Sequence, residues 1–86
     1  MSMRKPREEV MRRYVEGAII SAARLWRHWI RRGLSDEEAM KRAIKQAYNM
    51  VKSSGLSLEE ALNTLKDVRR IMDELIKIIQ EEVEKS

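Results

Sequence analysis

The sequence has no cysteine and no phenylalanine, and it has only one proline and three glycines among 86 residues. The lack of cysteine excludes disulfide bonds and thiolate metal sites. Because helix-breaking residues are so few, almost the whole chain is free to form regular helix. Hydrophobic residues make up 43% and charged residues 37%, a balance typical of folded helical proteins and not of disordered chains. We therefore expect one small domain covering residues 1–86.

Long apolar runs and functional motifs are also missing. No stretch approaches the roughly 20 apolar residues that a membrane-spanning helix needs, and residues 1–6 are not followed by the apolar core of a secretory signal. The sequence contains no glycine-rich phosphate loop, no zinc-binding histidine pair and no EF-hand loop. We therefore expect a soluble protein that is not secreted, from the cytoplasm or a recombinant source, with no membrane partner. We expect no enzymatic activity, catalytic residue, cofactor or metal.

Apolar residues recur at helical spacing in three segments, which predicts helices over about 6–32, 36–53 and 58–85. In the first, the spacing alternates between four and three residues from Met11 to Trp29, the pattern of a packed helix seam. In the second, the residues expected to face inward are Met40, Ala43, Ile44, Ala47, Met50 and Val51. In the third, they are Leu62, Leu65, Val68, Met72, Leu75, Ile76, Ile79 and Val83.

The two connections between these segments follow the same pattern. Residues 33–35 and 55–57 both read Gly-Leu-Ser, and a glutamate follows three residues after each serine. Glycine ends one helix, leucine supplies a hydrophobic staple, and the serine and glutamate form a capping box for the next helix. Because such short loops join antiparallel neighbours, the sequence predicts an all-α, up-down-up three-helix bundle with a shorter middle helix. This agreement of caps, loops and periodicity along the whole chain resembles computationally designed helical bundles. The resemblance implies a de novo protein, and it names no function.

The predicted helices differ in length, with about 18 residues in the second against about 27 and 28 in the others. The end of the third helix should therefore extend past its neighbour by roughly 15 Å at 1.5 Å per residue. This overhang carries isoleucines and a valine, and an exposed apolar patch of this kind marks an interface. We expect self-association into a homo-oligomer, or binding to another protein. Tryptophan and arginine are enriched at interface hot spots, so the predicted contact surface is Ile19, Ile20, Ala23, Trp26, Arg27 and Ile30.

Two other functions are consistent with the first helix. Residues 1–33 carry a net charge of +6 and residues 34–86 a net charge of −2. An arginine face formed by Arg13, Arg24, Arg27 and Arg31 suits phosphate groups, which makes nucleic-acid binding the first alternative. The plainer interpretation is that these arginines pair with the acidic end of the third helix.

The second alternative concerns His28, the only histidine. A neutral histidine can ligate haem iron, and Gly17, Ala18, Ser21 and Ala22 form a strip of small residues on the same helix. A flat ring or another small molecule would fit against such a strip. Close approach of a neighbouring helix explains it equally well.

Overall fold

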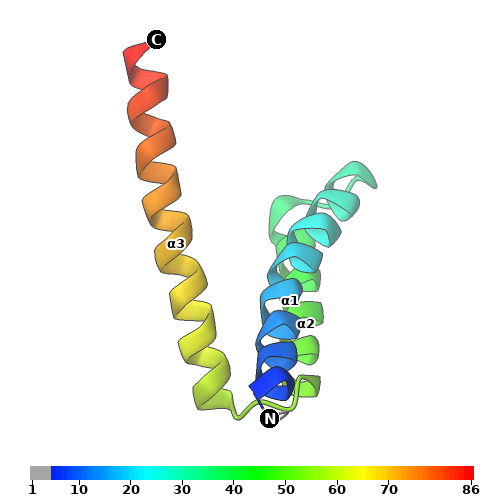
Figure 1. Cartoon of the computed structure of the whole chain (residues 1–86). Coiled ribbons are helices and arrows are strands. Elements are labelled where there is room, and N and C mark those ends of the chain that lie inside the picture. The colour runs from blue at the N-terminus through cyan, green and yellow to red at the C-terminus, as the bar shows by residue number, and fades with distance from the viewer. Residues whose placement is uncertain (1–4) are drawn as a thin grey trace.

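The structure is a computed structural model that describes the backbone of residues 5–86 and the side chains from Arg7 onward. It contains α1 (Lys5–Arg31), α2 (Asp36–Ser53) and α3 (Leu58–Lys85), and no strand occurs in this part of the chain. The 18 residues of α2 stand between helices of 27 and 28 residues. Figure 1 shows the chain running up, down and up. The predicted three-helix fold with a short middle helix is confirmed, and each helix boundary lies within one residue of its prediction.

The core lies mainly between α1 and α2 and is built from small side chains. Val15 is the largest side chain that is fully buried. Because alanine projects so little from the backbone, two alanine-lined helices approach closely and bury their facing surfaces completely. The buried cluster consists of Val15, Ala18 and Ala22 from α1, Ala43, Ala47 and Val51 from α2, and Ala61 from α3.

Only the first three turns of α3 contact this α1–α2 hairpin. Ala61 and Thr64 are buried and Leu65 and Val68 are half-buried, whereas all residues from Arg69 to Ser86 are exposed. Figure 1 shows α3 starting beside the N-terminal end of α1 and then diverging from the hairpin. The uncovered part of α3 is therefore longer than the roughly ten residues predicted from helix lengths.

The expected inward residues of α3 need correction. Five of the eight, namely Met72, Leu75, Ile76, Ile79 and Val83, are between 43% and 65% exposed. Leu62 is exposed as well, and so are Met40 and Ile44 of α2. Periodicity identifies the apolar face of a helix correctly, but it does not determine whether another helix covers that face. Here α3 turns away from α1 and α2, so these apolar side chains stay in solvent.

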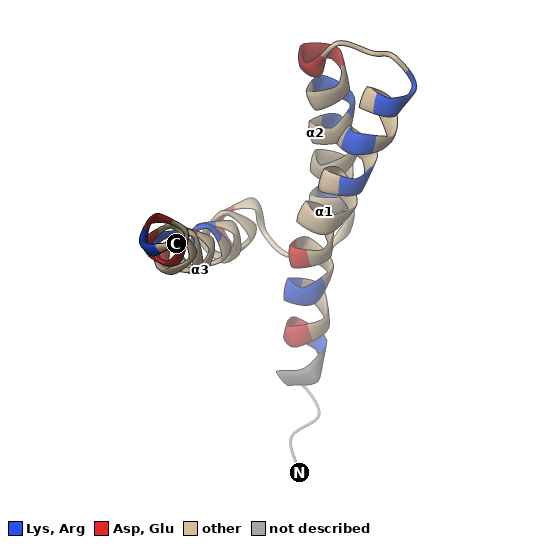
Figure 2. Cartoon of the chain, turned by 90° about the horizontal axis from the view of Figure 1, so that it is seen from above, with Lys and Arg blue, Asp and Glu red and all other residues tan. Residues whose placement is uncertain are grey.

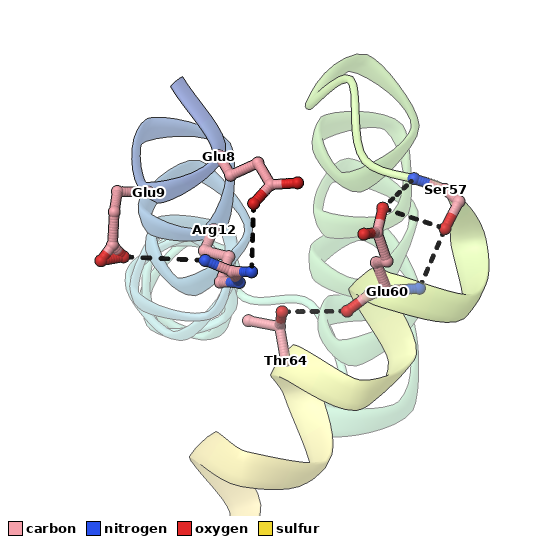
Figure 3. A network of polar contacts seen from close by, with 6 residues as sticks. All are labelled: Glu8, Glu9, Arg12, Ser57, Glu60 and Thr64. Atoms are coloured by element: carbon pink, nitrogen blue, oxygen red, sulfur yellow. Dashed lines mark hydrogen bonds and ion pairs between the residues drawn. The ribbon is translucent and has the colours of Figure 1, made fainter. Parts of the chain in front are cut away.

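The helix ends form as the capping residues predict. Gly33 has φ +99°, and Leu34 N–H donates to the carbonyl oxygen of Trp29 at 3.0 Å, the pattern of a Schellman motif. Ser57 and Glu60 form a complete capping box at the start of α3 (Figure 3). At α2 only half of the predicted box is present among the described residues: Ser35 Oγ accepts from the backbone N–H of the glutamate, without the reciprocal bond.

The small core predicts sensitivity to overpacking. Replacing Ala18 with leucine should destabilise the fold by about 1–3 kcal/mol, because the added atoms have no space between α1 and α2. The same change at the exposed Ala23 on α1 is the matched control and should be nearly neutral. Thermal unfolding followed by circular dichroism measures both variants. Equal melting temperatures for the two would contradict a tightly packed α1–α2 seam.

Two glycines on or beside α1 allow a second comparison. Gly33→Ala should cost about 1 kcal/mol or more, since alanine is strained at the positive φ that ends the helix. Gly17→Ala should instead stabilise by about 0.5–1 kcal/mol, because Gly17 is within the helix and no atom lies within 4 Å of an added Cβ. Urea titration should move the two midpoints in opposite directions. A Gly33→Ala midpoint at or above that of the unchanged protein would refute the conformational argument.

Candidate interaction surface

An extended uncovered apolar surface lies on the distal part of α3. We name it the α3 apolar face, and its members are Ile71, Met72, Leu75, Ile76, Ile78, Ile79 and Val83, all exposed. At 100° per residue these side chains span about 160° of the helix circumference. This is wider than the seam of a simple two-helix contact, so more than one neighbouring element is needed to cover it.

The α3 apolar face continues the side of the helix that is buried near its start. Met72 lies seven residues after Leu65, which packs against the core, and Ile79 lies seven residues further on. Residues seven apart share a helix face. The surface that anchors the first turns of α3 to the hairpin thus runs on for four more turns without cover.

An apolar groove of about 300 Å³ adjoins this face where the three helices meet. Four of its lining residues come from α3 and four from α2, and Ile19 comes from α1. Four of the nine lining residues, Ile44, Tyr48, Leu58 and Leu62, are exposed. The lining residues are Ile19, Ile44, Ala47, Tyr48, Val51, Leu58, Ala61, Leu62 and Leu65.

The predicted contact surface on α1 divides into two faces. Ile19 lines the groove, and Ala23, Trp26 and Ile30 follow it at spacings of four, seven and eleven residues, so they share its side of the helix. Ile20 is exposed on another side, and it shares that side with Arg27, seven residues later. The predicted surface therefore covers two sides of α1, which face different surroundings.

Both tryptophans are half-buried and join the end of α1 to the start of α2. Trp26 Nε1 donates a hydrogen bond of 2.8 Å to Asp36 Oδ1, and its ring packs against the core cluster. The guanidinium of Arg42 lies 4.5 Å from the Trp29 ring centroid, within the range of a cation–π contact. Trp26 therefore supports the monomer itself, in addition to the binding role predicted for it.

The arginine face is present as predicted. Arg13, Arg24, Arg27 and Arg31 are all exposed and recur at spacings that keep them on one side of α1. The predicted pairing with the acidic end of α3 is absent: the ion pairs among residues 7–86 join residues of the same helix. Two of them link Arg12 to Glu8 and Glu9 (Figure 3). The physical reason is that α3 diverges, so the C-terminal ends of α1 and α3 lie apart (Figures 1 and 2).

His28 is exposed, with its ring edge-on to Trp29 at 5.0 Å between centroids. A shallow hollow of about 320 Å³ beside it is lined by Ser21, Arg24, Leu25, His28 and Gln46. The strip of small residues expected to receive a flat ring instead packs against α2, since Ala18 and Ala22 belong to the buried cluster. A ligand at His28 would therefore rest on an open surface and not in an enclosed pocket.

The described part of the chain contains neither a candidate metal site nor a candidate membrane-spanning helix. No group of three or more acidic or histidine side chains among residues 7–86 is arranged to hold a metal ion. Along residues 5–86, no helix combines the length and the apolar character that crossing a bilayer requires. No protein-family model, curated protein or solved structure matches this sequence.

The sequence analysis did not predict the groove. It assigned no role to Tyr48 or Leu58, and it expected Leu62 to be buried, whereas all three are exposed. A signal for Tyr48 was available, because it follows Ile44 by four residues and so extends the apolar side of α2 beyond the seam. Ile71 and Ile78 of α3, which are not among its eight expected inward residues, widen the apolar side of that helix. An apolar side this broad indicates that a helix packs against more than one neighbour. Only the direction of α3 in the structure shows which part of that side is left uncovered.

The hydrogen bond of Trp26 gives a direct test. Trp26→Phe keeps an aromatic ring but removes the donor to Asp36, so it should destabilise the monomer by about 0.5–1.5 kcal/mol. Asp36→Asn weakens the acceptor, and a double-mutant cycle isolates the pair. Chemical denaturation in dilute solution provides the free energies. A coupling energy of zero would mean that the bond contributes nothing to the α1–α2 junction.

Proposed function

We propose that this protein is a non-enzymatic helical module for protein interaction or self-assembly, which binds through the α3 apolar face and the adjoining groove. The proposal rests on the α3 apolar face itself, in which seven large apolar side chains between Ile71 and Val83 lie exposed on one side of the helix. Surface patches of this size in soluble proteins mark interaction sites. The regular caps and loops support the further proposal that the chain was designed de novo.

The total surface area supports an incomplete monomer. The chain exposes 7371 Å², whereas a compact monomer of 10.2 kDa is expected to expose roughly 5,300 Å². Its radius of gyration is 15.9 Å, against about 12 Å for a compact domain of this length. The excess area, about 2,000 Å², is larger than the roughly 800 Å² that each partner contributes to a standard protein interface.

The energetics of a single helix point the same way. Isolated helices in water are only marginally stable, and most helical stability in proteins comes from packing of the apolar face. Beyond Val68, α3 continues for 17 residues to Lys85 with its apolar face in solvent. A binding partner would supply the missing packing and bury isoleucine side chains, each worth about 1.5–3 kcal/mol when fully covered.

Nucleic-acid binding remains the second candidate, because the arginine face is exposed and makes no ion pair within the described residues. Binding of this kind depends on phosphate contacts, so its affinity would fall steeply with added salt. Apolar association would change far less. Salt dependence therefore separates the two functions.

Size-exclusion chromatography with light scattering tests the first proposal. The protein should associate at both low and high salt, since apolar burial is the main driving force. Ile79→Glu should abolish association, because it places a charge in the centre of the α3 apolar face. Arg70→Glu, on the opposite side of α3, is the matched control and should associate normally.

The Ile79→Glu chain should keep the helicity of the unchanged monomer, since Ile79 makes no core contact in the structure. A monomer at all concentrations and both salts, or an Ile79→Glu variant that associates as well as the control, would refute an interaction role for this face.

A further inference from the structure

We infer that α3 closes onto the α1–α2 hairpin of its own chain, so that residues 69–77 cover an apolar strip which the hairpin leaves open. The arrangement in Figure 1 is then the open one of two. This inference goes beyond the proposed function, because closing covers four residues of the α3 apolar face and withholds them from a partner. A partner and the hairpin therefore compete for the same side of α3. The four residues are Ile71, Met72, Leu75 and Ile76.

The strip that α3 would cover follows both helices of the hairpin. On each helix its members recur at spacings of four or seven residues, so they share one side of that helix. Four of the six members are between 37% and 56% exposed, and the other two are half-buried. We name it the hairpin strip, and it consists of Ile19, Trp26 and Ile30 of α1 and Met40, Ile44 and Tyr48 of α2.

The hairpin strip and α3 already meet at the groove. Ile19, Ile44 and Tyr48 line the groove together with Leu62 and Leu65 of α3. The α3 apolar face continues the side of the helix on which Leu65 lies, so it is turned toward the side of the hairpin that carries the strip. Beyond the groove, the divergence of α3 separates the two surfaces (Figure 1).

The two surfaces also match in level along the bundle. Helices α1 and α3 run in the same direction (Figure 1) and rise equally, by about 1.5 Å per residue. Leu65 and Ile19 line the same groove, which sets their relative level. Met72 and Trp26 each lie seven residues further along, so closing places the methionine beside the indole ring.

A basic residue borders the hairpin strip on its outer side. At 100° per residue, Arg27 lies about 80° around α1 from Ile19. It lies on the side away from Ala18 and Ala22, which are buried in the seam with α2. Arg27 is exposed and makes no ion pair within residues 7–86. A helix that covered the strip would therefore bring its own outer border close to this guanidinium.

The corresponding border of α3 carries an acidic residue. Glu74 lies about 40° beyond Ile78, at the edge of the α3 apolar face, on the side away from Leu62, which faces α2 across the groove. Glu74 is also exposed and without an ion pair in the described residues. Its level along the bundle differs from that of Arg27 by one residue. Closing α3 thus places opposite charges side by side, which favours this register.

The start of α3 provides the joint for this movement. The loop before it, residues 54–57, reads Ser-Gly-Leu-Ser, and Gly55 has φ +94°. Ala61 and Thr64 anchor the first turns, and no residue beyond Val68 is buried in a contact that closing would break. A few loop residues can absorb the backbone change of such a hinge. Because both surfaces belong to one chain, their effective concentration is high.

Two introduced cysteines test closure, because the chain has none of its own. Ile30→Cys and Leu75→Cys replace side chains that are exposed in the open arrangement, so the fold should be kept. A short bis-maleimide suits the 8–10 Å between packed helix axes, and in dilute solution it should link these cysteines within one chain. The matched control pairs Ile30→Cys with Lys77→Cys. Lys77 has nearly the same level but lies on the opposite side of α3, so linking should be about tenfold slower.

Electrophoresis and mass spectrometry separate a linked single chain from a linked dimer. Equal linking rates for the two variants would overturn the inference. A linked dimer would also overturn it, because the hairpin strip would then bind α3 of another chain. Neither result bears on the Ile79→Glu test, which decides the interaction role of the α3 apolar face independently.

The linked single chain tests the competition with a partner. Its Kd for association should be about tenfold higher or more than that of the unlinked double-cysteine chain, because four apolar side chains are covered. Equal association of the linked and unlinked chains would overturn the competition. If the unlinked chain is itself monomeric, the proposed function fails, and the linking rates still decide closure.

Charge reversal in the Ile30→Cys, Leu75→Cys chain gives an independent measurement. Glu74→Lys should slow linking about threefold, since it places two positive charges side by side. Adding Arg27→Glu should restore the rate. Glu84→Lys, on the side of α3 opposite Leu75, is the control and should leave the rate unchanged. Failure of the second reversal to restore linking would overturn the register.

Discussion

The close contact of small side chains between α1 and α2 is the constraint on which the rest of the structure depends. Ala18, Ala22, Ala43 and Ala47 let the two helices approach closely and bury one another. This seam buries the facing sides of α1 and α2, while apolar side chains beside it, including Ile44 and Tyr48, remain exposed. The hydrogen bond from Trp26 to Asp36 and the cation–π contact between Trp29 and Arg42 then hold the helices together at the loop end of the hairpin.

The position of α3 follows from this arrangement. Its start is held by the capping box at Ser57 and Glu60 and by packing of Ala61 and Leu65 against the hairpin. Beyond Val68 no residue of the helix is buried against the hairpin, and the helix continues into solvent. The monomer thus combines a closed half, with a buried core, and an open half whose apolar surface is uncovered.

This division explains why an interaction role fits the chain better than chemistry at an enclosed site. The hollow at His28 is shallow, and the small residues near it are already used for packing. The α3 apolar face and the groove, in contrast, are large, continuous and apolar.

Local sequence determined the three helices, their ends and the apolar side of each. These properties depend on residues close together in the chain: glycine at a positive φ, serine and glutamate at helix starts, and spacings of three and four. The alanines of the seam and the arginine face were also readable, since both follow directly from helical periodicity.

Only the tertiary structure decided which apolar surfaces are covered. The difference between the buried Ala61 and the exposed Leu75, Ile76 and Ile79 arises from the direction in which α3 leaves its loop. The same geometry separates the arginines of α1 from the glutamates of α3. Both features depend on residues that are far apart in the chain. The spacing of apolar residues identifies the apolar face of one helix, but it does not identify the element that packs against that face.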